Sequence, residues 1–377
     1  MPVQDFQVNV SESILADLRE RIRRTRWPDE ITDSGWTYGA DLAYIKDLAA
    51  YWLEGFDWRD VESRINVYPN FVAEIAGHKI HFIHVKGIGK RSVPLILTHG
   101  WPGSFLEFMK LIPLLTAGAP ITFDLVIPSL PGYGFSGKST SPGCNIHVIA
   151  DLWRGLMDEL NYERFGAHGG DFGSGVSTVL ALKYPRRIIG LHVNSIESYF
   201  SPYVPDGEHL STEEIQFMEE SGEWDKREGG YAHQQTTRPL TLAYGLNDSP
   251  VGLCAWIIEK FFNWSECNGS LESIFTRDEL LANITLYWVT QTIHSSIRLY
   301  HETRKVPLRF SKDDFVSVPV GITHFPSESP FPPRRYIERS FKVQRWTEMP
   351  AGGHFAAMEQ PGLLADDIRA FFDDLVQ

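Results

Sequence analysis

Cysteine and basic charge are both scarce in this chain, and each scarcity excludes a class of protein. Only three cysteines occur among 377 residues and none forms a CxxC pair, so the sequence predicts neither a disulfide framework nor a zinc site. The 35 Lys and Arg residues are outnumbered by 48 Asp and Glu residues, which gives a net charge of −13. That charge disfavours binding to nucleic acid or to an anionic membrane surface.

Long hydrophobic runs are also missing from the sequence. No window reaches the roughly 18 uninterrupted apolar residues that a membrane-spanning helix needs. The N-terminal stretch MPVQDFQVNVSES lacks a charged start followed by an apolar run, so it does not indicate a signal peptide. Because so few cysteines suit a reducing compartment, we expect a soluble, cytoplasmic protein.

Apolar and aromatic residues, by contrast, are plentiful. Hydrophobic residues make up 43% of the chain and include 11 Trp and 23 Phe, which is typical of a compact globular protein with many buried rings. A chain of this length can bury a large core, and it has room for one large domain or several smaller ones. The size and composition therefore suit an enzyme.

The first 72 residues are predicted to form a helical, loop-rich extension, because no strand alternation occurs before Ala73. Apolar residues Ile14, Leu18 and Ile22 recur at helical spacing after Ser11, which is a favoured N-cap residue. We expect this extension to pack against a core that later residues form.

Residues 73–197 alternate between strand and helix patterns. AEIAGHKIHFIHVKG alternates around a glycine-containing turn, and further strands are indicated at VPLILTHG, FDLVIPSL, RFGAHGG and IIGLHVNS. Helical stretches such as FLEFMKLIPLL and IHVIADLWRGLMDEL lie between them. This order predicts an α/β fold with a mostly parallel sheet and helices on both faces.

Two further segments complete the predicted architecture. Residues 198–311 are polar, helical and aromatic-rich, which indicates a helical cap inserted after the sixth strand. Strand patterns return in residues 312–377 at VSVPVGITHF and FKVQRWTEM, and an amphipathic helix closes the chain. The core is therefore predicted to consist of two parts, 73–197 and 312–377.

The stretch HGGDFGSG places Asp171 at the centre of a small-x-nucleophile-x-small pattern. In such a sharp strand-to-helix turn, glycines relieve the crowding around a strained nucleophile. Ser174 is an unsuitable alternative, because Phe172 and Val176 occupy the flanking positions that must be small. Taken alone, the pattern fits an aspartate N-cap as well as a nucleophile.

Other residues stand in the chain order nucleophile, acid, histidine that this kind of turn requires. His354 lies in the loop GGHFAAMEQP between the last strand and the last helix, and Glu328 follows VSVPVGITHF. Glu197, after IIGLHVNS, is the alternative acid. The motif HGWPGS ends another strand and predicts an oxyanion hole formed by the N–H groups of Trp101 and Phe172.

An aspartate nucleophile indicates displacement at a saturated carbon. Asp171 is ionised without a base, and its attack forms an alkyl ester whose carbonyl belongs to the enzyme. His354, held by Glu328, can then activate the water that hydrolyses this ester. The leaving group is an epoxide oxygen or a halide, which leaves an epoxide hydrolase and a haloalkane or haloacid dehalogenase as alternatives. A ligand-binding protein with idle catalytic residues is the third interpretation.

The motifs HGWPGS, SLPGYGFSG, GGDFGS and GGHFAAMEQP together resemble the epoxide hydrolases of the α/β-hydrolase superfamily, in particular their microsomal-type branch. RTRWPD and LNDSPVGLCAWIIEKF are similar to that branch as well, so the resemblance runs from about residue 10 to residue 372. No membrane anchor is evident in this sequence, which makes it look like the soluble fungal and bacterial members.

The resemblance implies an α/β-hydrolase fold and conversion of an apolar epoxide to a vicinal diol, with no cofactor and no metal. It implies Asp171 as the nucleophile, Glu328 and His354 as the charge-relay pair, and Trp101 and Phe172 as oxyanion donors. It leaves a homodimer open, because related soluble enzymes pair through the cap and the N-terminal region.

The resemblance also implies two cap tyrosines that protonate the epoxide oxygen, and by motif position these are Tyr231 and Tyr300. A phenol suits this role, because its proton can pass to an alkoxide. Phe172 stands where many relatives carry Trp, so we expect an altered pocket shape and the same chemistry. A dehalogenase usually has Trp at this position, which favours the epoxide.

Overall fold

The computed structural model describes residues 3–118, 120–196 and 200–376. Its centre is a nine-stranded sheet with the strand order β1-β2-β3-β5-β4-β6-β7-β8-β9. The strands are β1 (Gln4–Phe6), β2 (Asn70–Ile75), β3 (His78–Val85), β4 (Ser92–Thr98), β5 (Thr122–Pro128), β6 (Phe165–Gly169), β7 (Ile188–Val193), β8 (Val316–His324) and β9 (Phe341–Glu348).

Most of this sheet is parallel, as the sequence predicts. All neighbouring pairs from β5 to β9 run parallel, whereas the pairs β1–β2, β2–β3 and β3–β5 are antiparallel. A parallel sheet is covered on both faces, which explains the near-continuous apolar runs in its strands. In β4, for example, Leu95, Ile96 and Leu97 are all fully buried.

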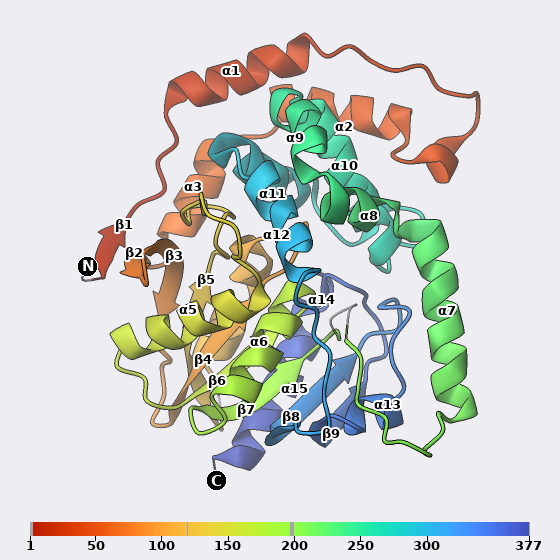
Figure 1. Cartoon of the computed structure of the whole chain (residues 1–377). Helices are drawn as coiled ribbons and strands as arrows, with labels where there is room; N and C mark the ends of the chain where they lie inside the picture. The colour runs from red at the N-terminus through yellow and green to blue at the C-terminus, as the bar shows by residue number, and fades with distance from the viewer. Residues whose placement is uncertain (1–2, 119, 197–199, 377) are drawn as a thin grey trace.

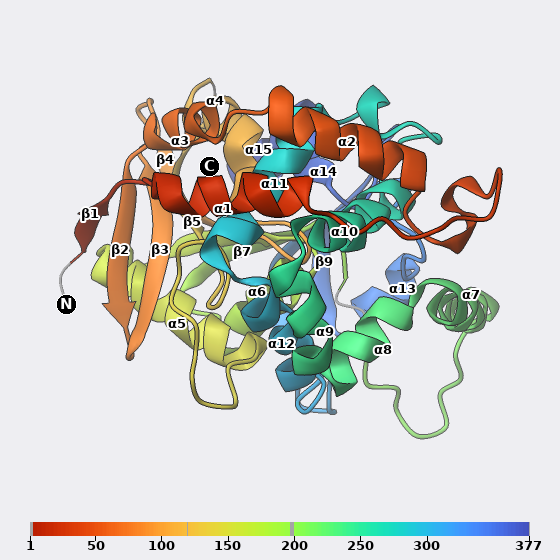
Figure 2. The same cartoon turned by 90° about the horizontal axis from the view of Figure 1, so that it is seen from above.

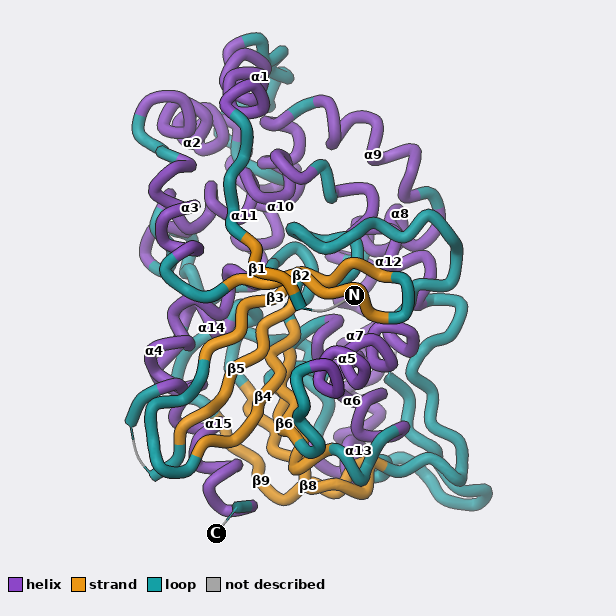
Figure 3. The backbone as a smooth tube through the Cα atoms, turned by 90° about the vertical axis from the view of Figure 1, so that its left-hand side faces the viewer, coloured by secondary structure: helices purple, strands orange, loops and turns teal. Residues whose placement is uncertain are grey.

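Helices cover both faces of the sheet, and Figure 3 shows α5 (Ile146–Glu159) and α6 (Phe172–Lys183) on the opposite side of the strands from α4 (Leu111–Thr116) and α15 (Pro361–Leu375). The α15 ring of Phe372 lies directly against Gly166 of β6, so this helix packs closely on the sheet. The predicted α/β architecture, a mostly parallel sheet with helices on both faces, is confirmed.

Between β7 and β8 the chain forms a helical cap, which lies at one end of the sheet in Figure 1. The cap contacts the loop after β4, because the side chains of Asn283 and Tyr287 donate hydrogen bonds to the carbonyl oxygens of Pro102 and Gly103. Its helices are α7 (Thr212–Glu228), α8 (Gly230–Thr237), α9 (Pro239–Asp248), α10 (Pro250–Trp264), η3 (Leu271–Ser273), α11 (Arg277–Thr290) and α12 (Ile293–Thr303).

The cap follows the seventh strand of the chain and not the sixth, because the extension contributes β1. This strand has three residues and pairs with β2 at the edge of the sheet. So short a strand shows no alternation in sequence, and only its pairing partner defines it.

The N-terminal extension packs chiefly on the cap. Figure 2 shows α1 (Glu12–Arg23) lying across α10 and α11, and Trp52 donates a hydrogen bond to Thr285 of α11. The predicted buried face of α1 needs one correction: Leu15 is buried with Leu18 and Ile22, while Ile14 is 39% exposed. The remaining helices of the extension are η1 (Gly35–Tyr38), α2 (Leu42–Glu54) and α3 (Trp58–Asn66).

Three short helices in the two core segments complete the secondary structure: η2 (Phe105–Lys110), α13 (Arg334–Glu338) and α14 (Ala356–Glu359). η2 is a 3-10 helix that follows HGWPGS and leads into α4, so FLEFMKLIPLL forms two short helices instead of one. Among the described residues, no helix combines the length and the apolar character that crossing a membrane requires.

Candidate active site

Asp171 lies in the sharp turn between β6 and α6, where it is the N-cap of α6. Its backbone has φ 50° and ψ −130°, a conformation that costs energy for any residue other than glycine. The surrounding structure holds this conformation, because the N–H of Asp171 donates a 2.6 Å hydrogen bond to Oγ of Ser195, which follows β7. Strain of this kind is characteristic of functional turns.

Glycine is required around this turn for reasons of space. A Cβ atom at Gly173 would overlap the carbonyl oxygen of Thr98 in the neighbouring strand β4. A Cβ atom at Gly100 would overlap the carboxylate of Asp171. The two glycine-containing motifs thus meet at the carboxylate, and each leaves room for the other.

The two oxygens of the Asp171 carboxylate have different surroundings. Oδ1 accepts hydrogen bonds from the backbone N–H groups of Trp101, at 2.9 Å, and Phe172, at 2.7 Å. Oδ2 lies 3.7 Å from Nε2 of His354. Burial raises the pKa of the Asp171 carboxyl, while the charge of His354 and the two N–H donors act in the opposite direction. One oxygen is therefore held by two N–H groups and the other faces the imidazole.

His354 lies between two carboxylates. Its Nδ1 is 2.8 Å from Oε2 of Glu328, which follows β8, and its backbone N–H donates to the carbonyl oxygen of Trp264 in the cap. Burial lowers the pKa of His354, but Glu328 and Asp171 together outweigh it and raise that pKa to about 9. In the ligand-free protein the imidazole is therefore protonated at neutral pH. The alternative acid, Glu197, lies outside the described residues.

The two predicted tyrosines pack against Trp101 and Phe172, whose N–H groups hold Oδ1 of Asp171. Tyr300 of α12 is 4% exposed, and its ring packs edge-on against Phe172 with the ring centroids 4.6 Å apart. Tyr231 of α8 stacks on Trp101, at 5.5 Å between centroids, and lies 5.9 Å from the Tyr300 ring. Burial raises the pKa of Tyr300 well above its ordinary value, and Tyr231 and Asp171 act in the same direction. Its phenol therefore keeps its proton at neutral pH.

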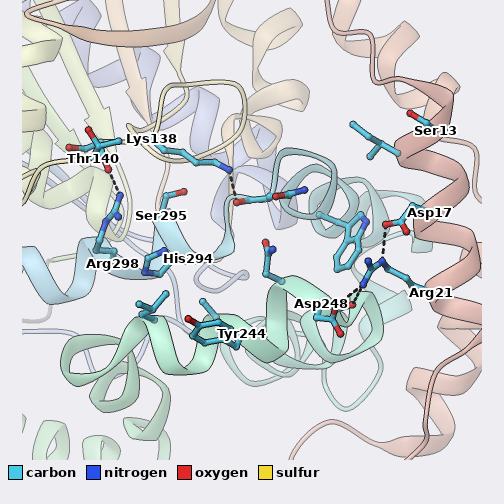
Figure 4. Close-up of a pocket in the computed structure, with 17 residues that line it drawn as sticks. Ser13, Asp17, Arg21, Lys138, Thr140, Tyr244, Asp248, His294, Ser295 and Arg298 are labelled. Carbon is cyan, nitrogen blue, oxygen red and sulfur yellow. Dashed lines mark hydrogen bonds and ion pairs between the residues drawn. The ribbon is translucent and has the colours of Figure 1, made fainter.

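A large pocket of about 900 Å³ lies elsewhere, between α1 and cap helices α9, α11 and α12. Figure 4 shows His294 and Arg298 of α12 on one side of it and Arg21 of α1 on the other. No residue of the predicted site lines this pocket, so it is separate from the Asp171 carboxylate. Within the described ranges, His, Cys, Asp and Glu form no group of three or more that could hold a metal ion.

Three polar residues close to Asp171 were not predicted from the sequence: Glu107, Asn194 and Ser195. Asn194 and Ser195 follow β7, which pairs with β6, so the predicted strand order is the signal that could have located them. Glu107 belongs to η2, immediately after HGWPGS. Its position depends on how that loop turns back, and no local pattern reveals this.

Comparison with known proteins identifies the family. Residues 3–108 match the family described as epoxide hydrolase N terminus, and residues 93–227 match the α/β-hydrolase fold. Epoxide hydrolase 1 of Sus scrofa is 38% identical over 406 aligned residues, which cover 100% of this chain and 89% of that protein. The chain belongs to the epoxide hydrolase family. The family resemblance predicted from its motifs is confirmed, and the protein is a hydrolase.

Solved structures of epoxide hydrolases share this fold over the whole chain. The juvenile hormone epoxide hydrolase of the silkworm Bombyx mori superimposes with a TM-score of 0.86 at 32% identity, covering 99% of this chain and 94% of that one. The epoxide hydrolase of Aspergillus niger has a TM-score of 0.86 at 29% identity, covering 100% of this chain and 97% of that one. Membership of this family decides between the alternatives left open by the sequence, in favour of epoxide over halide.

Proposed function

We propose that this epoxide hydrolase converts an apolar epoxide and water to a vicinal diol through an alkyl ester on Asp171. The observation that carries the proposal is the difference in surroundings between the two carboxylate oxygens of Asp171. Oδ1 already occupies the pair of N–H groups that would stabilise an oxyanion, so it becomes the carbonyl oxygen of the ester. Oδ2 faces the imidazole of His354 instead, and it is the attacking atom.

The cap tyrosines act in the first step. As Oδ2 of Asp171 bonds to the epoxide carbon, the carbon–oxygen bond of the ring breaks and the departing oxygen takes a proton from Tyr231 or Tyr300. Both rings pack on the residues whose N–H groups hold Oδ1, and this packing supports a role for their phenols close to the nucleophile. The raised pKa of Tyr300 keeps its proton in place until an alkoxide develops.

His354 acts in the second step. Ester formation removes the negative charge of Asp171, which is one of the charges that raise the pKa of His354. The imidazole then passes its proton to the tyrosinate left by the first step and becomes the base that takes a proton from water. The water oxygen bonds to Cγ of Asp171, the bond from Cγ to the ester oxygen breaks, and the diol leaves with the proton that His354 returns. The new carboxyl group of Asp171 then gives its proton to His354, which restores the starting state. Glu328 stabilises the imidazolium.

The simplest test is diol formation from a panel of styrene-type, aliphatic and terpenoid oxides. We expect diol from at least one apolar epoxide without added metal or cofactor, and no halide from haloalkanes of similar size. If the purified, folded protein released halide and left every epoxide intact, the proposal would be wrong.

Removing one cap phenol should slow ester formation selectively. For Tyr300→Phe and for Tyr231→Phe we expect the rate of ester formation to fall by about 100-fold, because the departing oxygen loses a proton donor, and the double variant should lose more. Rapid-quench kinetics separate this step from ester hydrolysis, which should keep its native rate. Tyr244→Phe is the matched control, because Tyr244 is a cap tyrosine that is 75% exposed. Equal slowing of both steps would contradict the assignment.

His354 should titrate at a lower pH in the ester intermediate than in the free enzyme. His354 acts as a base only when it is neutral, so ester hydrolysis should become faster as pH rises through the pKa of His354 in the ester. That midpoint should lie below the value of about 9 in the free protein, because the ester lacks the charge of Asp171. Single-turnover hydrolysis rates measured across pH give the midpoint in the ester, and NMR titration of His354 gives the midpoint in the free protein. A midpoint in the ester at or above that of the free protein would contradict this mechanism.

A further inference from the structure

A small cavity lies against the Asp171 carboxylate. Its volume is about 10 Å³, and Asp171, His354, Glu107 and Asn194 are among the residues that line it. A cavity needs roughly 10–15 Å³ of this kind of space to hold one water molecule. The cap tyrosines are not among the lining residues. The cavity is thus distinct from the place where an epoxide meets both the nucleophile and the phenols.

This cavity also has the polar lining that a water molecule requires. A buried water forms two to four hydrogen bonds, so a roughly water-sized space with apolar walls stays empty. Three of its lining residues carry polar side chains: Glu107 a carboxyl group, His354 an imidazole, and Asn194 an amide that lies against Gly170. The site therefore combines the size and the chemistry for one ordered water beside the imidazole and the carboxyl group of Asp171.

Glu107 is the unexplained member of this lining. Its carboxyl group folds back over the loop that follows β4, where a Cβ atom at Gly103 would overlap its Oε1 atom. Burial raises the pKa of Glu107 to about 8, with Asp171 adding to the shift and His354 opposing it. Among the described residues, no Lys or Arg charge contributes to this shift. Enclosing a carboxyl group is costly for folding even in its protonated form, so a role in the reaction explains it better than stability does.

We propose that Glu107, with Asn194, holds the hydrolytic water between His354 and the ester carbonyl carbon of Asp171. The inference rests on the proposed function, and it deepens the second step. One hydrogen of the water points to Nε2 of His354, which takes it as the oxygen attacks. The other hydrogen is donated to the carbonyl oxygen of the Glu107 carboxyl group, which fixes the direction of the oxygen lone pair. Glu107 is a water-positioning residue and exchanges no proton in this step.

The test separates the two half-reactions in Glu107→Gln and Glu107→Leu. Misplacing a reacting group by about 1 Å can cost about 100-fold in rate. We therefore expect ester hydrolysis in Glu107→Leu to slow by about that factor, and Glu107→Gln, which keeps an acceptor oxygen, to slow less. Ester formation should stay within about twofold of native, so the ester accumulates and kcat falls while the rate of the first step is kept. Rapid-quench kinetics with an epoxide from the diol assay give both rates.

Glu359→Gln is the matched control. Glu359 is also a buried carboxyl near His354 with a pKa raised to about 7, but it accepts hydrogen bonds from two backbone N–H groups and does not line the cavity. Replacing it tests whether the loss of any carboxyl group near the imidazole slows ester hydrolysis. Slowing of hydrolysis by Glu107→Gln and not by Glu359→Gln supports the proposal. Native hydrolysis rates in both Glu107 variants, or equal slowing of both steps, overturn it.

Two further measurements keep the test decisive. If either Glu107 variant unfolds at a lower temperature, Asn194→Ala probes the same water from the other side and should also slow hydrolysis alone. A high-resolution crystal structure of the ligand-free native protein should show one water within hydrogen-bond distance of Glu107 and His354, and a dry cavity would overturn the inference. Failure of the native protein to form any ester would instead contradict the proposed function.

Discussion

Replacing His354 with glutamine should cause the ester intermediate on Asp171 to accumulate. Glutamine cannot accept the proton of the attacking water, so we expect ester hydrolysis to slow by about 10,000-fold, the upper end of what general base catalysis contributes. Intact-protein mass spectrometry should then show a mass increase equal to the mass of the epoxide. The increase should map to the peptide that contains Asp171.

Ester formation in this variant should survive, with a shifted pH dependence. The charge of His354 opposes the effect of burial on the pKa of Asp171, so its removal lets that pKa rise further. The carboxylate is then the minor form at lower pH, and ester formation should be measured at alkaline pH. His294→Gln is the control, because His294 lines the large pocket between α1 and the cap, which is separate from the Asp171 carboxylate. A His354→Gln variant that turns over at the native rate, or forms no ester at alkaline pH, would contradict the role given to the imidazole.

Replacing Asp171 with asparagine should abolish turnover while leaving the fold intact. The amide oxygen can still accept hydrogen bonds from Trp101 and Phe172, but the amide nitrogen is not a nucleophile. We expect diol formation to fall by at least about 1,000-fold, with no ester detected. Circular dichroism and the thermal unfolding midpoint should stay close to native, because asparagine is as good an N-cap as aspartate.

The same substitution distinguishes the two roles that the sequence allows for Asp171, helix N-cap and nucleophile. Were Asp171 only the N-cap of α6, asparagine would replace it without effect on activity. Asp57→Asn is the matched control, because Asp57 caps α3 and its side chain accepts a hydrogen bond from the N–H of Arg59. Loss of diol formation in the first variant and not in the second assigns chemistry to Asp171. An active Asp171→Asn enzyme would remove the basis of the covalent mechanism.

The parts of the structure that local chemistry dictates could be predicted from the sequence. The turn around Asp171 is specified by its own glycines, and the parallel strands are specified by buried apolar runs of the right length. The geometry also brings together His354 and Glu328, which are far from Asp171 in sequence, because parallel strands end at the same edge of a sheet. For the same reason the N–H groups of Trp101 and Phe172 meet at one carboxylate oxygen.

Features that depend on tertiary contacts could not be predicted in this way. The strand β1 exists only because β2 offers a free edge. Ile14 is exposed because α1 packs on the cap with Leu15, Leu18 and Ile22 on its buried face. Tyr231 and Tyr300 were assigned by resemblance alone, since nothing in their local sequence distinguishes them from the other tyrosines. Glu107 escaped prediction because its carboxyl group reaches the site by folding back over Gly103.

A single turnover in oxygen-18-labelled water, with enzyme in excess over epoxide, tests the covalent ester most directly. Because the water attacks Cγ of Asp171, the label should enter the carboxyl group of Asp171, and the first diol released should carry no label. Mass spectrometry of the Asp171 peptide and of the diol measures both. A labelled first diol with an unlabelled Asp171 would mean that water attacks the epoxide directly, and would contradict the covalent ester.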